Sequence, residues 1–150
     1  MAVQLSDGSV LLNMRDNRNR NNRDENGRRI CVTSDLGATW TEHPTSRKAL
    51  IEPTCMASIH KHSYRQDGKE KSILLFANPE AYSERNRMTL KVSYDDGNTW
   101  PGDRTILLDE YRGRGYSCIT SVDENTIGIL YESSQADMIF QQIKLNELVP

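Results

Sequence analysis

The stretch Thr33-Ser34-Asp35-Leu36-Gly37-Ala38-Thr39-Trp40 recurs sixty residues later as Ser93-Tyr94-Asp95-Asp96-Gly97-Asn98-Thr99-Trp100. Both copies begin with a hydroxyl residue and then place Asp, Gly, Thr and Trp at the same spacing. An Asp in such a stretch accepts hydrogen bonds from nearby backbone N–H groups, the Gly supplies a positive φ, and the Trp can bury its ring against a neighbouring sheet. The pattern predicts two tight hairpin turns in a protein built from repeated units.

Short runs of β-branched and aliphatic residues, separated by polar turns, occur along the whole chain. They predict strands, besides a strand-like run at residues 1–5, at Val10–Met14, Arg29–Thr33, Met56–His60, Ser72–Phe76, Met88–Ser93, Tyr116–Val122, Thr126–Tyr131 and Met138–Ile143. Turns such as Asp7-Gly8, Asp67-Gly68 and Asp123-Glu124-Asn125 separate these runs. Residues 78–85 are the one stretch where we expect a short helical turn. The predicted fold class is all-β.

The bulk composition excludes several classes of function. A net charge of −2, from 19 basic and 21 acidic residues, argues against a nucleic-acid-binding protein. No apolar run approaches the roughly 18 residues of a membrane span. Cys31, Cys55 and Cys118 lack metal-ligand spacing and predict buried free thiols. His60 and His62 alternate on one strand face without a third ligand, so no metal site and no cofactor are predicted.

The two repeated stretches resemble the Asp box of the sialidase superfamily and other β-propellers, which lies between the third and fourth strands of a blade. A four-stranded blade and the sixty-residue spacing indicate about two to three blades. The resemblance implies a six-bladed β-propeller of which residues 1–150 form the C-terminal portion. Its open faces are then expected to be covered by the missing N-terminal half or by a second chain. Because Asp boxes also occur in propellers that are not hydrolases, other residues must indicate the function.

Three further segments resemble the exo-α-sialidases, or neuraminidases, of bacterial type. They are Asp7-Gly8-Ser9-Val10-Leu11-Leu12-Asn13-Met14-Arg15-Asp16-Asn17, then residues 76–93, and Gly113-Arg114-Gly115-Tyr116-Ser117-Cys118-Ile119-Thr120 with Leu130-Tyr131-Glu132 after it. The resemblance implies that Arg15 and Arg85 belong to an arginine triad that binds the substrate, with Arg87 as the alternative to Arg85. It implies that Tyr116 is the nucleophile and that Glu132 orients an arginine of the triad.

These residue types suit sialic acid, whose anomeric carbon carries a carboxylate. Guanidinium groups bind a carboxylate through charge-assisted hydrogen bonds of about 1.5–3 kcal/mol each. A carboxylate nucleophile would be repelled by that anion, whereas a neutral phenol would not. Since the free pKa of tyrosine is about 10, a carboxylate must act as general base. The resemblance places this Glu at or just before Met1, and it places the acid/base Asp and the first arginine outside the chain.

The function implied is retaining hydrolysis of terminal sialic acid from glycoconjugates, with sialylated glycans as partners. The isolated chain is expected to be inactive because it lacks the base, the acid and one arginine. For the parent enzyme a secreted or periplasmic location is expected. Two alternatives stay open, a non-catalytic propeller that binds carbohydrate or protein and a trans-sialidase. The first has no need for Arg15, Arg85, Tyr116 and Glu132 together, and the second requires an aromatic acceptor site that the sequence does not identify.

Overall fold

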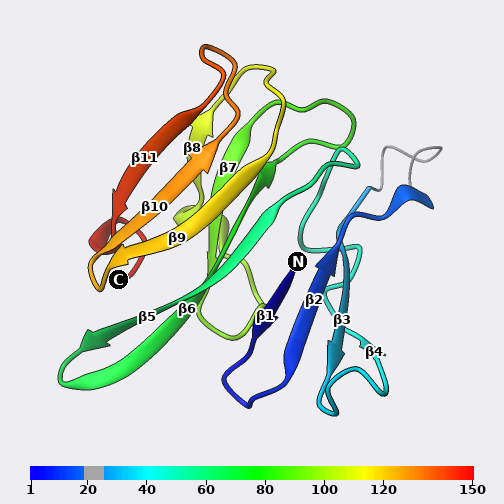
Figure 1. Ribbon diagram of the computed structural model, residues 1–150, viewed down its shortest axis with the longest axis vertical. Coiled ribbons are helices and arrows are strands. Elements are labelled where there is room, and N and C mark those ends of the chain that lie inside the picture. Colours follow the sequence, from blue (N-terminus) through cyan, green and yellow to red (C-terminus); the bar gives the residue numbers. More distant parts are fainter. Residues whose placement is uncertain (19–25) are drawn as a thin grey trace.

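A computed structural model describes residues 1–18 and 26–150 and folds them into three antiparallel sheets (Figure 1). The first sheet contains β1 (Ala2–Gln4), β2 (Val10–Met14), β3 (Arg29–Thr33) and β4 (Thr41–Glu42). The second contains β5 (Ser58–Gln66), β6 (Lys69–Pro79), β7 (Met88–Ser93) and β8 (Ile106–Asp109), and the third contains β9 (Ser117–Asp123), β10 (Thr126–Tyr131) and β11 (Ile139–Lys144). The predicted all-β class is confirmed.

Every sheet is a simple meander, because each strand pairs with the next strand along the chain. The first strands of the three sheets, β1, β5 and β9, lie next to one another (Figure 1). Within each sheet the later strands lie progressively farther from this line of first strands. This is the arrangement expected of consecutive propeller blades, in which first strands surround an axis.

The second sheet is the centre of the structure because both of its faces are covered. Leu74 and Phe76 of β6 pack toward the first sheet, whereas Ile73, Leu75 and Ala77 pack toward the third. Side chains alternate between the two faces of a strand, so a strand buried on both faces reads as a continuous apolar run. This explains why residues 73–77 are all apolar and why all of them are almost fully buried.

Both repeated stretches form the hairpin turns predicted for them, between β3 and β4 and between β7 and β8. In the second turn the Asp95 carboxylate accepts hydrogen bonds from the Ser93 hydroxyl at 2.8 Å and from the N–H and hydroxyl of Thr99 at 2.8 and 2.7 Å. The Gly97 N–H donates to the Ser93 hydroxyl at 2.9 Å, and Gly97 has φ = 88°. Asp35, Thr33 and Thr39 repeat these contacts in the first turn. One carboxylate therefore closes each turn.

The tryptophans of the two turns differ in their surroundings. Trp100 meets Phe76 edge-to-face, with the ring centroids 5.9 Å apart, and joins the core between the first and second sheets. Trp40 is 46% exposed and lies over Gly37 of its own turn. The prediction that the ring is buried against a neighbouring sheet is confirmed for Trp100 and wrong for Trp40. The reason is that none of the described sheets packs against the face that carries Trp40.

Three other expectations need correction. Residues 78–85 form no helical turn, because β6 continues to Pro79 and bends follow it. The short strands β4 and β8 had no sequence signal of their own and depend on pairing with β3 and β7. Only one of the cysteines is buried, Cys55, which lies outside the strands. Cys118 is exposed on the uncovered face of the third sheet, and all three thiols are free.

Replacing Asp95 by Ala is expected to destabilise the chain by about 1–2 kcal/mol, because the turn loses the carboxylate that accepts from Ser93 and Thr99. Urea unfolding followed by tryptophan fluorescence measures this change. Asp103→Ala is the matched control, since Asp103 is 79% exposed and reaches Arg104 only at 3.9 Å. Equal stability of the two variants would contradict the role assigned to the turn.

Stability should also fall in acid through these turns. Hydrogen bonds from Thr39 lower the pKa of Asp35 to about 2. Burial alone would raise the pKa of Asp95, but the hydrogen bonds from Thr99 and Ser93 outweigh burial and lower it. Both folded pKa values lie below the unfolded value of about 4, so the stabilisation is complete above about pH 4 and is lost as the pH falls toward 2. Unfolding midpoints between pH 6 and pH 2.5 should show this loss, and D35N/D95N should show a shallower one.

Candidate functional site

The four residues singled out by sequence lie at one edge of the three sheets, the upper edge in Figure 1. Arg15 follows the end of β2, and Glu132 follows the end of β10. Arg85 precedes β7, and Tyr116 directly precedes β9. Because neighbouring strands run in opposite directions, the ends of even-numbered strands and the starts of odd-numbered strands meet at the same edge. The meander topology thus gathers residues that are up to 117 positions apart.

Arg85, Tyr116 and Glu132 are in direct contact. The Arg85 guanidinium carbon lies 5.5 Å from the centroid of the Tyr116 ring, a cation–π distance. Tyr116 and Glu132 are joined twice: the Glu132 N–H donates to the Tyr116 carbonyl at 2.9 Å, and the Tyr116 N–H donates to Glu132 Oε2 at 3.2 Å. Tyr116 is 40% exposed, and none of the described residues hydrogen-bonds to its hydroxyl. The phenol is therefore presented to solvent beside a fixed positive charge.

Gly115 fixes the direction in which Tyr116 enters the site. Its φ of +88° is strained for residues with a side chain. A Cβ at this position would lie 2.8 Å from Pro79 Cγ and 3.2 Å from Cys55 Sγ, so there is also no room for one. The Arg85 Nη1 donates to the carbonyl of Arg114 at 2.9 Å and holds the other side of this loop. Glycine at position 115 is thus a structural requirement of the turn before β9.

Arg15 lies at the same edge, and within the described part of the chain no hydrogen bond or ring contact joins it to Arg85, Tyr116 or Glu132. Its side chain is exposed. Its neighbour Asp16 is buried: the Asp16 N–H donates to Glu52 Oε1 at 2.9 Å, and Asp16 Oδ2 pairs with Arg47 at 2.9 Å. These contacts fix the backbone on which Arg15 stands. Arg87, the alternative to Arg85, is exposed and has φ = 54°, and it makes no ring contact with Tyr116.

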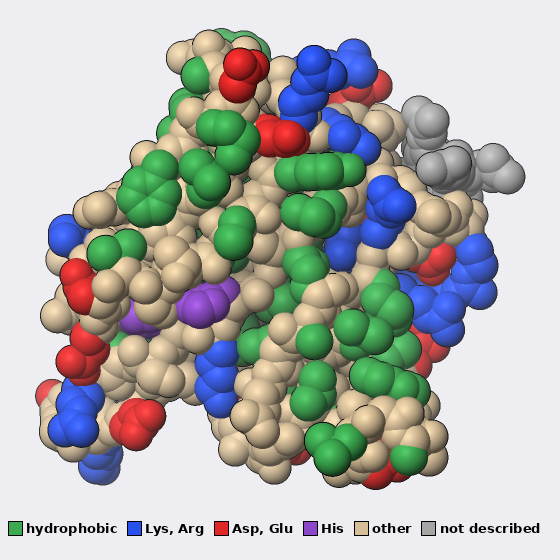
Figure 2. Space-filling view, in the orientation of Figure 1, with side chains coloured by type: hydrophobic (Ala, Val, Ile, Leu, Met, Phe, Trp, Pro, Cys, Tyr) green, Lys and Arg blue, Asp and Glu red, His purple; other side chains and the backbone are tan. Residues whose placement is uncertain are grey.

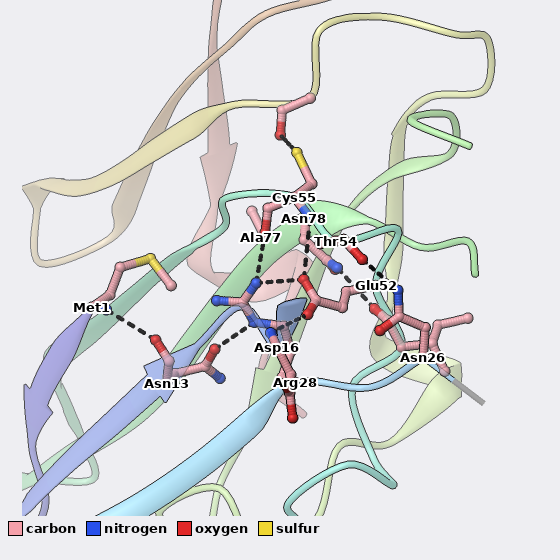
Figure 3. A network of polar contacts seen from close by, with 12 residues as sticks. Met1, Asn13, Asp16, Asn26, Arg28, Glu52, Thr54, Cys55, Ala77 and Asn78 are labelled. Atoms are coloured by element: carbon pink, nitrogen blue, oxygen red, sulfur yellow. Dashed lines mark hydrogen bonds and ion pairs between the residues drawn. The ribbon is translucent and has the colours of Figure 1, made fainter. Parts of the chain in front are cut away.

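A buried ion pair lies beneath this edge (Figure 3). Arg28 Nη1 donates to Glu52 Oε2 at 2.7 Å, and the two side chains are 2% and 0% exposed. Arg28 also donates to Asn13 Oδ1 and to the Cys55 carbonyl, each at 2.7 Å. The Cys55 Sγ reaches the Gly115 carbonyl at 3.5 Å. The network therefore connects the segment that carries Arg15 with the loop that carries Tyr116.

Burial acts on the ionisation of both partners. It lowers the pKa of Arg28, an effect that Glu52 opposes and the nearby Arg15 strengthens. It raises the pKa of Glu52, against the influence of Arg28. For both side chains, burial shifts the pKa in the direction that favours the uncharged form. Since a guanidinium is not deprotonated in proteins, Arg28 stays charged and holds Glu52 as its carboxylate partner.

No motif in the sequence predicts this ion pair. Arg28 closes the Asn- and Arg-rich loop 16–28, and arginines in a loop of this composition are usually solvated, whereas Arg28 is buried. Residues 19–25 of the loop lie outside the described residues. In a run that contains several arginines, no residue type distinguishes the buried one. The burial of Arg28 depends on the tertiary structure, because Glu52 and Asn13 come from other segments and both bind its guanidinium.

The two predicted strand histidines do share a face of β5. His60 Nε2 lies 2.9 Å and His62 Nδ1 lies 2.7 Å from the Ser121 hydroxyl, and His62 Nε2 lies 3.0 Å from the Glu124 carbonyl. Among residues 1–18 and 26–150 no group of three or more His, Cys, Asp or Glu side chains is placed to hold a metal ion. No helix in the described part of the chain is long and apolar enough to cross a membrane.

The fold and the site together define a class, an Asp-box protein made of meander sheets, with an arginine stacked on an exposed tyrosine at one edge. The chain is 44% identical over 147 residues to a sialidase of Bacteroides fragilis strain YCH46, which covers 98% of this chain and 26% of that protein. It is 33% identical over 132 residues to a sialidase of Micromonospora viridifaciens, covering 87% of this chain and 19% of that protein. The chain is therefore homologous, over nearly its whole length, to a segment of bacterial sialidases.

Solved structures agree with this result. A Hadza microbial sialidase superposes with a TM-score of 0.87 at 44% identity, over 99% of this chain and 27% of its own. Intramolecular trans-sialidases of leech and of Ruminococcus gnavus give TM-scores of 0.72 and 0.71 at 19% identity, which shows a shared fold. They cover 98% and 99% of this chain and 23% and 32% of their own. No protein-family model matches the chain. The chain spans about a quarter of the length of the sialidase from Bacteroides fragilis.

Replacing one partner of the Arg28–Glu52 pair should lower the stability of the chain far more than replacing both partners. Arg28→Met or Glu52→Leu alone is expected to destabilise the chain by about 3–5 kcal/mol, because a buried group loses its partner, whereas R28M/E52L should cost less than either. Urea unfolding of the three variants forms the test. A double variant as unstable as the sum of the single variants would show that the pair is not coupled.

Proposed function

We propose that this chain is the C-terminal part of the catalytic domain of an exo-α-sialidase, a retaining glycoside hydrolase that releases terminal sialic acid from glycoconjugates. The domain is a six-bladed β-propeller, to which the three sheets contribute consecutive blades. The observation that carries the proposal is the stacking of Arg85 on the exposed Tyr116, next to Glu132, in a chain homologous to sialidases.

In the proposed reaction, Arg15 and Arg85, with a third arginine from outside the chain, bind the substrate carboxylate. The Tyr116 oxygen attacks the anomeric carbon, and its proton passes to a glutamate that is also outside the chain. The bond to the leaving sugar breaks, and an acidic Asp outside the chain protonates the leaving oxygen. Water, deprotonated by the same Asp, then cleaves the sialyl–tyrosine bond and releases sialic acid with retained configuration.

The described contacts support these roles. The guanidinium of Arg85 lies over the ring of Tyr116, where a positive charge favours the developing phenolate. Glu132 accepts a hydrogen bond from the Tyr116 backbone and pairs with none of the described arginines, so its carboxylate keeps acceptor capacity for the third arginine. Arg15 and Arg85 come from different sheets, which suits a single anion held from two sides.

Two rival functions make different predictions. A propeller that only binds carbohydrate or protein does not require an exposed tyrosine beside Arg85. A trans-sialidase uses the same core residues, and the leech and Ruminococcus gnavus trans-sialidases share this fold, so the fold does not distinguish the two activities. The hydrolase is favoured because the relatives that match at 44% and 33% identity are named sialidases.

The test is turnover of a fluorogenic sialoside by the full-length protein that contains this segment. Tyr116→Phe should lower kcat by about 10²–10⁴-fold, since it removes the attacking oxygen and keeps the ring. Arg85→Lys should lower kcat/KM by about tenfold or more, because a lysine cannot replace a bidentate guanidinium. Tyr111→Phe is the matched control, because Tyr111 is 66% exposed, lies five residues away in the chain, and should be replaceable without loss.

Each outcome has a distinct meaning. Unchanged turnover of a folded Tyr116→Phe protein would make the tyrosine structural. An inactive wild-type protein that still binds sialylated glycans would support the binding propeller. Transfer to an added sugar in excess of hydrolysis would identify a trans-sialidase. The 150-residue chain by itself should show no turnover, because the proposed base and acid are not part of it.

A further inference from the structure

We propose that a hollow lined by Arg85, Arg112 and Arg114 binds a second anionic group of the substrate, carried by the sugar to which the terminal sialic acid is attached. The inference rests on the proposed function, and it names a substrate class: sialosides whose leaving sugar bears a carboxylate or a sulfate. Neutral leaving sugars, as in sialyllactose, would leave this hollow unused.

The hollow has a volume of about 630 Å³ and opens beside the candidate site. Its lining includes three guanidinium-bearing residues and a single carboxylate, that of Asp137, with Ser134 and Gln135 as further hydrogen-bonding groups. Figure 2 shows basic side chains near the upper edge of the molecule, where β7 and β9 begin, with acidic side chains among them. The lining is therefore positively charged and rich in donors, as a carboxylate or sulfate requires.

Fixed backbone on both sides forms the walls of the hollow. On one side the Gly113 N–H donates to the Arg85 carbonyl at 3.0 Å, and a Cβ on Gly113 would meet the Glu132 and Ser133 backbone at 3.0 Å. Arg112 and Arg114 therefore flank a closely packed glycine. The resulting wall is held in place by packing and hydrogen bonds.

The opposite wall is the turn after β10. The Ser134 N–H donates to Asp109 Oδ2 at 2.7 Å, and the Ser134 hydroxyl reaches the same carboxylate at 2.8 Å. The Ser133 hydroxyl accepts the Ala136 N–H at 2.9 Å. Asp109 accepts these hydrogen bonds and forms no ion pair with any of the described arginines.

The arginines of the hollow are poorly neutralised by the protein. Arg112 approaches Glu84 at 3.6 Å, with side chains that are 79% and 53% exposed, which makes a weak surface pair. Within the described residues Arg114 forms no ion pair, and Arg85 donates one hydrogen bond to the Arg114 carbonyl. Like charges gathered in this way repel one another, so an anion in the hollow would relieve the repulsion as well as accept hydrogen bonds.

The chemistry of the substrate decides which anion this is. In a sialoside the carboxylate and the leaving oxygen are attached to the same anomeric carbon. A sialic acid whose carboxylate is bound by Arg85 therefore directs its leaving sugar to the neighbourhood of Arg85. Since Arg85 is shared between the Tyr116 site and the hollow, the next sugar can reach Arg112 and Arg114. A charge on that sugar is the group that these arginines would recognise.

Binding to the full-length protein that contains this segment, with Tyr116→Phe to prevent turnover, tests the inference. This variant is titrated at low ionic strength, followed by calorimetry, with 3′-sialyllactose, α2,8-linked disialic acid and a sulfated sialyllactose. Disialic acid and the sulfated glycan should bind about tenfold more tightly than sialyllactose, and this preference should shrink in high salt. R112A/R114A should abolish the preference and leave the affinity for sialyllactose unchanged. Arg65→Ala, an exposed arginine at the opposite edge of the sheets, is the control.

The outcomes separate the two proposals. Equal affinity for all three glycans, or a preference that survives R112A/R114A, would overturn the inference and leave the proposed function intact. Sialyllactose binding that is absent, or that is indifferent to Arg85→Ala, would contradict the proposed site itself. A preference for only one of the two charged glycans would support the hollow and identify its anion as the carboxylate or the sulfate.

Discussion

The ion pair between Arg28 and Glu52 is the interaction on which the rest of the site depends. It lies out of reach of water, and it binds the backbone of Asp16 on one side and the backbone of Cys55 on the other. Through Cys55 it also reaches Gly115, directly before the exposed Tyr116. A buried pair is costly to form, but once formed it is costly to break, because each partner would then be a lone buried charge. The network around this pair therefore holds the backbone beneath the edge of the sheets in place (Figure 3).

The site residues lie above this network, at the ends and starts of strands. Alternation along β6 lets one strand bury both of its faces, so the first and third sheets can pack against the same central sheet. The turns closed by Asp35 and Asp95 belong to the first and second sheets, where they keep the third strand paired with the fourth. The core thus fixes how the sheets stand relative to one another, and the loops at one edge are free to carry the charged and phenolic groups.

The electrostatics of that edge are asymmetric. Arg15, Arg85, Arg112 and Arg114 bring positive charge to it, whereas two of the carboxylates nearby are paired, Glu52 with Arg28 and Asp16 with Arg47. Among the described residues Arg85 and Arg114 form no ion pair and Arg112 forms only a weak one with Glu84, so this surface is suited to an anionic ligand. The same distribution explains how one edge can hold both a site for a terminal carboxylate and a neighbouring hollow for a second anion.

The sequence by itself determined the all-β fold, most strand positions, the two Asp-box turns and the resemblance to bacterial sialidases, because turn chemistry and alternating apolar runs are local properties. It also selected Arg85, Tyr116 and Glu132, which the structure brings into contact. It did not reveal the burial of Arg28, the exposure of Trp40 and Cys118, or the hollow beside Arg112. Those features depend on which distant segment lies against each side chain, and only the packing of the sheets decides that.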